Sequence, residues 1–233
     1  MTNTDLAPSL RDIVTGLLVP GEITILPITG QAGAGKTNYI VPMIKQMARE
    51  NGFWVRELAL DAFFILSSEE RSVWLAEGER ISPQEGDDRK NQLNWWNFSI
   101  AMQTLETLQD GKPVCLNGIY NRADKGRLTG NLSIEPPHEG LLLFEGVAVA
   151  HLLKGKPNLY IHAPRHIRFQ RLLERDKHRG LEEAQRRFEL TESFEKQYFR
   201  AHWPLIDYCI DNSNHNGVKD LPQLPKPELY DMD

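Results

Sequence analysis

Eight residues early in the chain form a pattern that few folds can accommodate. Residues 30 to 37 read Gly-Gln-Ala-Gly-Ala-Gly-Lys-Thr and satisfy G-x-x-x-x-G-K-[ST]. In this pattern the glycines present backbone N–H groups to phosphates, the lysine reaches the terminal phosphates and the last hydroxyl binds Mg²⁺. An apolar run precedes the segment, and apolar residues at helical spacing follow it. This order of strand, loop and helix predicts a P-loop fold, and a glycine-rich turn with an incidental lysine is the alternative. The predicted nucleotide-binding positions are Gly30, Gln31, Ala32, Gly33, Ala34, Gly35, Lys36 and Thr37.

The composition is ordinary for a folded domain and excludes several classes of function. The 233 residues carry a net charge of −5, which gives no global basic field for nucleic acid. Two cysteines, Cys115 and Cys209, are too few for a disulfide framework or a four-ligand zinc site. The first twenty residues lack a secretory signal pattern, and no apolar run approaches membrane-spanning length. We therefore expect a cytoplasmic protein without nucleic-acid or membrane partners.

Apolar and amphipathic segments alternate along the chain. We expect strands near 22–28, 53–60, 140–145, 157–162 and 206–211, and helices near 36–50, 66–77, 98–110, 164–178 and 181–200. This alternation predicts an α/β fold with a parallel sheet covered by helices on both faces. The segment 112–137 differs, because its apolar residues are spaced by two on either side of a polar stretch. We expect it to form a small antiparallel β-ribbon that walls a substrate site. The whole is predicted as one domain, 1–212, with an extended C-terminal tail, 213–233.

Ligands of such a sheet bind at the carboxyl ends of its strands, so polar residues that directly follow a strand are candidate site residues. Asp61 is the first of these. This residue follows the strand-like run 55–60 and precedes Ala62-Phe63-Phe64. A carboxylate at this point can orient an acceptor hydroxyl and take its proton late in phosphoryl transfer. A helix N-cap or a ligand of Mg²⁺-bound water is the structural alternative.

Glu145 ends a second apolar strand, Leu141-Leu142-Leu143-Phe144, and precedes Gly146. The segment is similar to a Walker B strand, whose carboxylate holds Mg²⁺ or its water shell. Apolar strands that end in Glu are common, but a phosphate loop in the same chain favours the metal role. Thr37 and Glu145 are the expected Mg²⁺-binding residues.

Cations gather on the segment predicted as the helix 164–178 and at its exit. Arg168, Arg171 and Arg175 are spaced by three and four, so they share one helix face. They could close over the phosphates and neutralise charge that develops during transfer. Acidic neighbours partly balance the run, so a solvated charged face is the alternative. The cluster continues with Lys177, His178 and Arg179.

Taken in chain order, these segments resemble the uridine kinase and phosphoribulokinase superfamily of P-loop kinases. The resemblance spans roughly residues 21–212 and rests on the phosphate loop, Asp61-Ala-Phe-Phe64, the strand ending in Glu145-Gly146, and Arg168-x-x-Arg171-x-x-x-Arg175-Asp176. It implies that Asp61 is the catalytic base and that Glu145 assists Mg²⁺. It also implies a lid over ATP near 164–182, formed with Arg168, Arg171 and Arg175, and a β-ribbon that helps to bind the acceptor.

Two segments depart from the uridine kinase pattern where the resemblance places the acceptor. Those enzymes carry Asp-x-Phe-Asp where this chain reads Asn94-Trp95-Trp96-Asn97-Phe98, and an amide lacks the carboxylate's charge. The two tryptophans either stack on a substrate ring or anchor the start of a helix. The second segment, residues 120–127, keeps the Tyr of the uridine kinases as Tyr120 but lacks the His that reads the pyrimidine base. It carries Arg122, Lys125 and Arg127 instead, and this positive charge favours an anionic or polyol acceptor over uridine. The expected acceptor residues are Asp61, Phe64, Trp96, Asn97, Tyr120, Lys125 and Arg127.

Together these features predict an ATP- and Mg²⁺-dependent kinase that phosphorylates a hydroxyl of a small metabolite. The expected catalytic residues are Lys36, Asp61, Arg171 and Arg175. The acceptor stays open among nucleoside-, sugar-, polyol- and hydroxy-acid-like compounds, and a homo-oligomer stays open as well. One alternative is a kinase of another P-loop branch, of the zeta-toxin, adenylylsulfate or shikimate type, against which the predicted ribbon argues. The other is a regulatory ATPase that uses hydrolysis as a switch.

Overall fold

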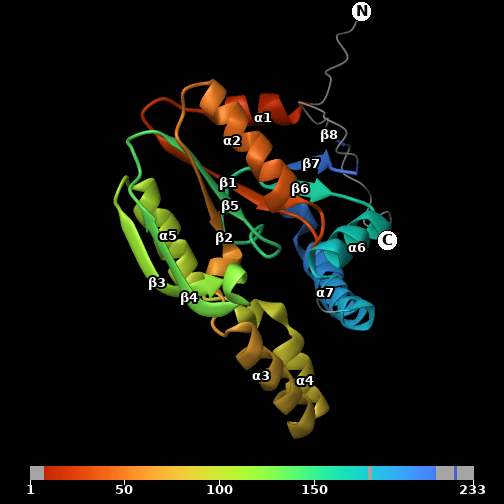
Figure 1. The fold of residues 1–233 in the computed structure, drawn as a ribbon. Helices are drawn as coiled ribbons and strands as arrows, with labels where there is room; N and C mark the ends of the chain where they lie inside the picture. Colours follow the sequence, from red (N-terminus) through yellow and green to blue (C-terminus); the bar gives the residue numbers. More distant parts are fainter. Residues whose placement is uncertain (1–7, 178–179, 214–222, 225–233) are drawn as a thin grey trace, which may run out of the picture. The chain divides into compact units, whose positions relative to one another are not determined.

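The computed structural model describes residues 8–177, 180–213 and 223–224 and divides the chain into two compact units (Figure 1). Unit 1 consists of Met1–Glu57 and Glu139–Asp233, and unit 2 consists of Leu58–His138. The predicted basic residues His178 and Arg179, and most of the predicted tail 213–233, lie outside the described residues. The two units are described separately below.

Unit 1 is built on a β-sheet with the strand order β2-β5-β1-β6-β7-β8. The strands are β1 Ile23–Thr29, β2 Val55–Ala59, β5 Gly140–Glu145, β6 Leu159–His162, β7 Tyr208–Asp211 and β8 Gln223–Leu224. β1 is parallel to β5 and β6, and β6 is parallel to β7, whereas β8 pairs antiparallel with β7. Every residue of β5 is buried, as in a strand covered on both faces. The predicted parallel α/β sheet is confirmed.

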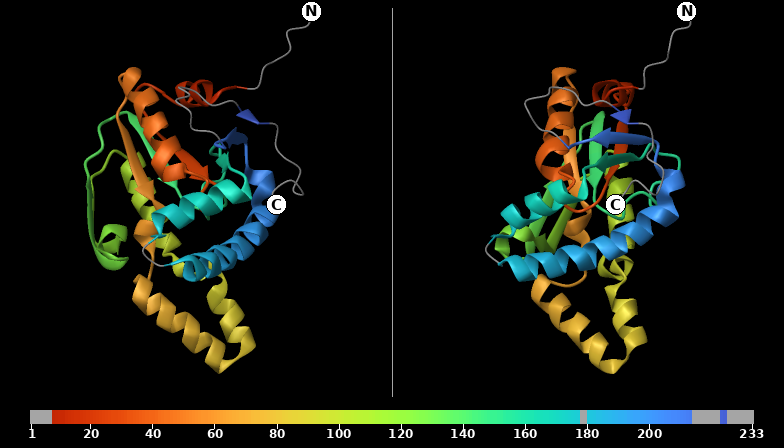
Figure 2. Two further views of the ribbon diagram at one scale, coloured as in Figure 1. Left: turned by 45° about the vertical axis from the view of Figure 1, so that its right-hand side comes forward. Right: turned by 90° about the vertical axis from the view of Figure 1, so that its right-hand side faces the viewer.

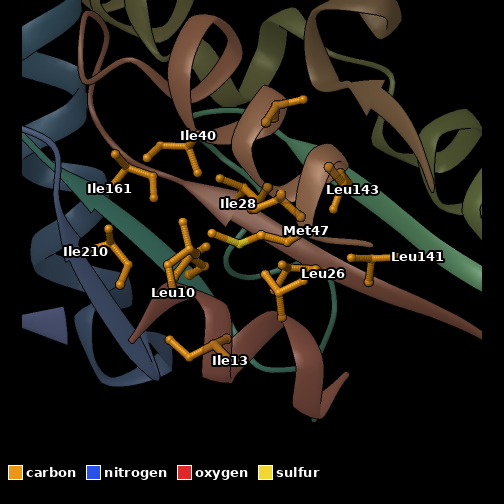
Figure 3. Close-up of a cluster of buried hydrophobic side chains, with 14 of the residues drawn as sticks. Leu10, Ile13, Leu26, Ile28, Ile40, Met47, Leu141, Leu143, Ile161 and Ile210 are labelled. Atoms are coloured by element: carbon orange, nitrogen blue, oxygen red, sulfur yellow. The ribbon is translucent and has the colours of Figure 1, made fainter. Parts of the chain in front are cut away.

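Helices cover both faces of this sheet. They are α1 Leu10–Gly16, α2 Val41–Glu50, α6 Arg165–Arg175 and α7 Leu181–His202. α1 and α2 pack on one face, where their apolar side chains share a core with alternate residues of β1, β5, β6 and β7 (Figure 3). On the other face the ring of Tyr160 lies 4.9 Å from Phe199 of α7 and 5.1 Å from Trp203. Because successive strand residues point to opposite faces, the continuously apolar strands supply buried side chains to the core on each face of the sheet.

Two helices were not expected from the sequence. α1 begins with a capping box, in which Ser9 and Asp12 each bind the other's backbone N–H. α4, Pro83–Lys90, follows α3, Ser68–Ile81, which continues beyond the predicted end near residue 77. Ser82 caps α4 and Pro83 occupies its first turn, so the chain leaves one helix and starts another at once. Figure 2 shows α3 and α4 as a helical hairpin.

The rest of unit 2 consists of three 3₁₀ turns, α5 and a two-stranded ribbon. The turns are η2 Leu60–Phe63, η3 Gln92–Trp95 and η4 Arg122–Asp124, and α5 spans Phe98–Gln109. β3, Val114–Asn121, and β4, Arg127–Ile134, pair antiparallel, with register shifts between Asn117 and Asn121. The predicted β-ribbon is confirmed. Within the part of the chain that the structure describes, no helix is both long enough and apolar enough to span a membrane.

Candidate functional site

The phosphate loop lies at the end of β1 and leads into a π turn, Lys36–Ile40, that continues as α2. Gly33 and Gly35 have φ angles of +80° and +89°, which L side chains rarely adopt. A Cβ at Gly33 would collide with the backbone of Arg168, and one at Gly35 would collide with the side chain of Asn212. The loop is therefore a tight cradle that larger residues cannot form.

Lys36 is buried, and its ammonium is held by the loop itself. Its Nζ donates to the carbonyl oxygens of Gly30 at 2.7 Å and Gln31 at 3.2 Å. The cation therefore already lies within the loop that is predicted to bind the phosphates. A phosphate oxygen would be a stronger acceptor than these carbonyls, because a charge-assisted hydrogen bond is stronger than one to a neutral group.

Thr37 and Glu145 come together because β1 and β5 run parallel in register. Ile28 is paired with Glu145, and the Gly146 N–H donates to the Ile28 carbonyl at 3.0 Å, so both strands end at the same level. The Thr37 hydroxyl donates to Glu145 Oε1 at 3.0 Å, and Glu145 is 7% exposed. A hydroxyl beside a single carboxylate suits Mg²⁺, which keeps several waters and uses substrate phosphates as further ligands. The described residues contain no group of three or more His, Cys, Asp or Glu that could hold a metal ion.

Arg171 of α6 contacts the phosphate loop. Its guanidinium donates to the carbonyl oxygens of Gly33 at 3.3 Å, Ala34 at 3.2 Å and Asn212 at 2.8 Å, and it lies 5.4 Å from the ring centre of Tyr39. Burial lowers the pKa of Arg171 from its ordinary value. The structure thus places Arg171, which the sequence assigned to ATP, against the phosphate loop.

The other two predicted arginines occupy different surroundings. Arg168 is 1% exposed; its guanidinium donates to Glu192 of α7 at 2.8 Å and to the Ala32 carbonyl of the phosphate loop at 3.5 Å, and it lies 3.8 Å from Glu195. Arg175 is partly exposed and pairs with its neighbour Asp176 at 3.0 Å. In this arrangement Arg168 ties α6 to α7, whereas Arg175 lies at the end of α6. A direct role for either one at ATP remains a prediction.

Glu195 joins this network directly to the phosphate loop. Its Oε1 accepts the backbone N–H of Ala32 at 2.7 Å, and the side chain is fully buried. Burial raises the pKa of Glu195 to about 7, although the nearby cations Lys36 and Arg168 oppose the shift. A buried carboxylate therefore fixes one peptide of the loop from the middle of α7.

We expect the Glu195→Gln variant to have a flatter dependence of stability on pH than the natural chain. A raised pKa favours the folded state below the ordinary value of 4.5, and this contribution is lost as the pH rises through about 7. The free energy of unfolding of the natural chain should fall relative to the variant by roughly 1–3 kcal/mol between those pH values. Urea denaturation at a series of pH values measures this difference. Glu189→Gln, an exposed change on the same helix, is the matched control, and a curve for Glu195→Gln parallel to that of the natural chain would contradict the assignment.

Asp61 of unit 2 lies in the 3₁₀ turn η2, directly after β2. It does not cap that turn, because the N-cap position is occupied by Ala59. Its Oδ2 instead accepts a hydrogen bond from Arg122 of the ribbon turn at 2.5 Å, and its side chain is 34% exposed. The structure therefore presents Asp61 as an accessible, ion-paired carboxylate.

An aromatic cluster beside Asp61 contains three of the predicted acceptor residues. The ring of Phe64 stacks on Trp96 at 5.3 Å and meets the edge of Tyr120 at 4.9 Å. The guanidinium of Arg71, from α3, lies 4.1 Å from the ring centre of Phe64 and 4.9 Å from that of Trp95. Trp96 is 7% exposed, so burial favours the prediction that it anchors the start of a helix.

The remaining predicted acceptor residues lie at a helix start and on the ribbon turn. Asn97 caps α5, because its side-chain oxygen accepts the Ile100 N–H at 3.1 Å. Lys125, with φ +54°, and Arg127 are exposed on the turn that links β3 to β4. Arg127 lies 3.5 Å from Asp124. Unit 2 thus gathers Asp61, Phe64, Trp96 and Tyr120 closely, while Lys125 and Arg127 are solvent-facing cations on the same ribbon.

Several residues that shape these sites were not predicted from the sequence. Glu192 and Glu195 fall on the apolar face of α7, at the same helical spacing as the buried Phe188 and Phe199. Acidic residues at core positions of a helix indicate a buried ion pair. The helical spacing of Glu192 and Glu195 could therefore have predicted that they are buried and paired. Asn212, Arg71 and the partner role of Arg122 depend on contacts distant in sequence and had no comparable local signal.

Comparison with solved structures shows where this fold occurs. Three similar structures are a candidate fructose transport system kinase from Silicibacter sp. TM1040, a candidate uridine kinase from Bacillus stearothermophilus and the phosphoribulokinase from Rhodobacter spheroides. Their TM-scores are 0.62, 0.57 and 0.56, and their sequence identities to this chain are 16%, 16% and 15%. The alignments cover 83%, 86% and 82% of this chain and 93%, 94% and 70% of those chains. No family model and no curated protein sequence matches the chain.

At these identities the likeness shows the fold alone. The chain shares the α/β fold of these three structures, as the sequence resemblance implied. The roles of individual residues are not tested by this likeness.

Proposed function

We propose that this chain is a kinase that transfers the γ-phosphoryl group of ATP, with Mg²⁺, to a hydroxyl of a small metabolite. The observation that carries the proposal is the glycine-shaped phosphate loop whose Thr37 hydroxyl lies 3.0 Å from Glu145. This pair of groups occurs in a chain whose fold is shared with uridine kinase-like and phosphoribulokinase proteins. Those names describe enzymes that phosphorylate small molecules, which makes the same class of reaction the best candidate here.

On the donor side, each residue has a role that its position in unit 1 supports. Lys36 would bind the terminal phosphates in place of its present carbonyl partners, and the backbone N–H groups of the loop would bind the others. Thr37 and Glu145 would hold Mg²⁺, which neutralises charge on the phosphates. Arg171, already hydrogen-bonded to the loop carbonyls, would stabilise charge that develops during transfer.

On the acceptor side, Asp61 would orient the acceptor hydroxyl and receive its proton as the new O–P bond forms. ADP leaves with the electron pair of the bond that breaks. Phe64 and Tyr120 would form an apolar wall, and Lys125 and Arg127 would supply positive charge nearby. Trp96 and Asn97 are better assigned to holding this region in shape, because one is buried and the other caps α5.

A regulatory ATPase is the second candidate, because a P-loop alone would also support hydrolysis. The two functions differ in their response to an acceptor. The kinase should release ADP several-fold faster in the presence of its acceptor, whereas a switch ATPase should be indifferent to small metabolites.

We expect a screen of nucleosides, sugars, polyols and hydroxy acids to contain at least one compound that stimulates ADP release. The measurement is a coupled assay of ADP with ATP and Mg²⁺, run with and without each compound. Release should also depend on Mg²⁺, because the metal that Thr37 and Glu145 would hold neutralises charge on the phosphates. ADP release at one constant rate under every condition would contradict the proposal and favour the ATPase.

A further inference from the structure

The proposed base of unit 2 is engaged by a cation in the structure. Arg122 donates to Oδ2 of Asp61 at 2.5 Å, and the two side chains are 59% and 34% exposed. Ion pairs with this exposure are weak, because water competes for both partners. A bound anion with good geometry can therefore replace the carboxylate as the partner of Arg122.

The turn that carries Arg122 is held by several backbone hydrogen bonds. The Asn121 side chain caps the turn by accepting the N–H of Ala123, and the Gly126 N–H returns to the Asn121 carbonyl at 2.9 Å. The Ser68 N–H of α3 donates to the Gly126 carbonyl at 2.8 Å. The turn is thus closed on itself and tied to α3.

The packing of Tyr120 fixes the base of the same turn. Its hydroxyl lies 3.0 Å from Ser68 Oγ, and its ring contacts Phe64 at 4.9 Å. A Cβ at Gly126 would collide with Ser68 Oγ and would lie 2.6 Å from the Tyr120 hydroxyl. These contacts hold the backbone of the turn in place.

Three cations, Arg122, Lys125 and Arg127, lie on or beside the turn. Arg122 pairs with Asp61, and Arg127 lies 3.5 Å from Asp124. A ligand with a compact oxyanion would be attracted to these cations, whereas a neutral ligand would gain little from them.

We propose that the acceptor carries a carboxylate or phosphate group and that Arg122 is its specificity-determining residue. On binding, the guanidinium exchanges Asp61 for the acceptor's oxyanion, and Oδ2 of Asp61 then becomes available to the acceptor hydroxyl. Arginine suits this exchange, because its planar fork matches either oxyanion with two parallel hydrogen bonds. The inference rests on the proposed kinase function, since it concerns the acceptor of that reaction.

The exchange would also make the chain discriminate between charged and neutral acceptors. A neutral polyol of the same shape offers no partner for the guanidinium, so Arg122 stays on Asp61 and one oxygen of the base remains occupied. A charged acceptor supplies that partner and frees the base in the same step. The charged member of a matched pair of acceptors should therefore be the better substrate.

The test compares matched acceptors with the natural chain, Arg122→Gln and Lys112→Gln. The pairs are gluconate against sorbitol for a carboxylate, and ribose 5-phosphate against ribose for a phosphate. Binding is measured by calorimetry without nucleotide, and kcat/KM is measured by ADP release. Lys112→Gln is the matched control, because Lys112 is an exposed cation of unit 2 that pairs with Asp110 instead of Asp61.

We expect at least one charged member to bind and to react, and the Arg122→Gln variant to lose about 10- to 100-fold in both measurements. The neutral partner of that pair should change by less than about threefold, and Lys112→Gln should behave as the natural chain. The two pairs show which oxyanion is preferred. Equal losses for charged and neutral members, or no preference for a charged member in either measurement, would overturn the inference.

The two measurements keep this inference separate from the kinase function. Phosphorylation of neutral acceptors alone would uphold the kinase and overturn the anion site. Charged compounds that bind through Arg122 without any turnover would uphold the anion site and count against the kinase.

Discussion

The Asp61→Asn variant should lose about 10²- to 10⁴-fold in turnover, while its affinity for ATP stays close to that of the natural chain. A general base contributes a rate factor of this size, and an amide cannot take the proton of an acceptor hydroxyl. Nucleotide affinity should persist, because the phosphate loop, Lys36 and Thr37 belong to unit 1 and Asp61 belongs to unit 2. The measurements are kcat with saturating ATP and acceptor, and the Kd of ATP by titration.

The control for Asp61→Asn is Asp110→Asn, which makes the same chemical change at an exposed residue of unit 2 that pairs with Lys112. Its turnover should equal that of the natural chain. The substitution also removes the ion pair between Asp61 and Arg122, so thermal unfolding of the variant shows whether the local structure survives. Full turnover in a folded Asp61→Asn variant would remove this residue from the role of base.

The Lys36→Met variant should lose about 10²- to 10³-fold in kcat/KM for ATP, the size of effect seen when a preorganised donor to developing charge is removed. Methionine fills a similar volume without the charge, so the buried space is not left empty. The two carbonyls that now accept from Nζ would lose their partner and the terminal phosphates would lose their cation. Steady-state kinetics with ATP varied, together with ATP titration, separate the loss of binding from the loss of rate.

Lys45→Met is the matched control for this change. Lys45 lies on α2 and is partly buried. Its ammonium pairs with Glu57 at 2.6 Å within the same unit. This variant tests the cost of removing a partly buried ammonium outside the phosphate loop. If Lys45→Met and Lys36→Met lost activity equally, the effect would be one of folding, and the role of Lys36 at phosphate would be refuted.

The sheet was predictable because its signals are local. β1, β5 and β6 are short apolar runs, and the phosphate-loop motif identifies β1 as the strand that is followed by the loop and a helix. The ribbon was also predictable, since its apolar residues alternate on both sides of a polar turn. α4 was missed because its sequence is almost wholly polar, so that hydrophobic periodicity carries no signal there.

More of the contacts in the donor site than in the acceptor site could be predicted from the sequence. Thr37 and Glu145 meet because parallel strands end at one edge of the sheet, a rule that holds before any coordinates are known. The burial of Arg168 could not be read from its spacing with Arg171 and Arg175, because its partners lie on another helix, α7. The hydrogen bond between Arg122 and Asp61 joins residues 61 positions apart, and no local sequence pattern predicts it.

The fate of the γ-phosphoryl group tests the central proposal most directly. The chain is incubated with γ-labelled ATP, Mg²⁺ and a mixture of nucleosides, sugars, polyols, hydroxy acids and sugar phosphates, with Asp61→Asn as the parallel sample. If the chain is a metabolite kinase, the label appears in an organic phosphate, and the variant forms this product about 10²- to 10⁴-fold more slowly. Label that appears only in inorganic phosphate, at a rate that no metabolite changes, would contradict the proposal.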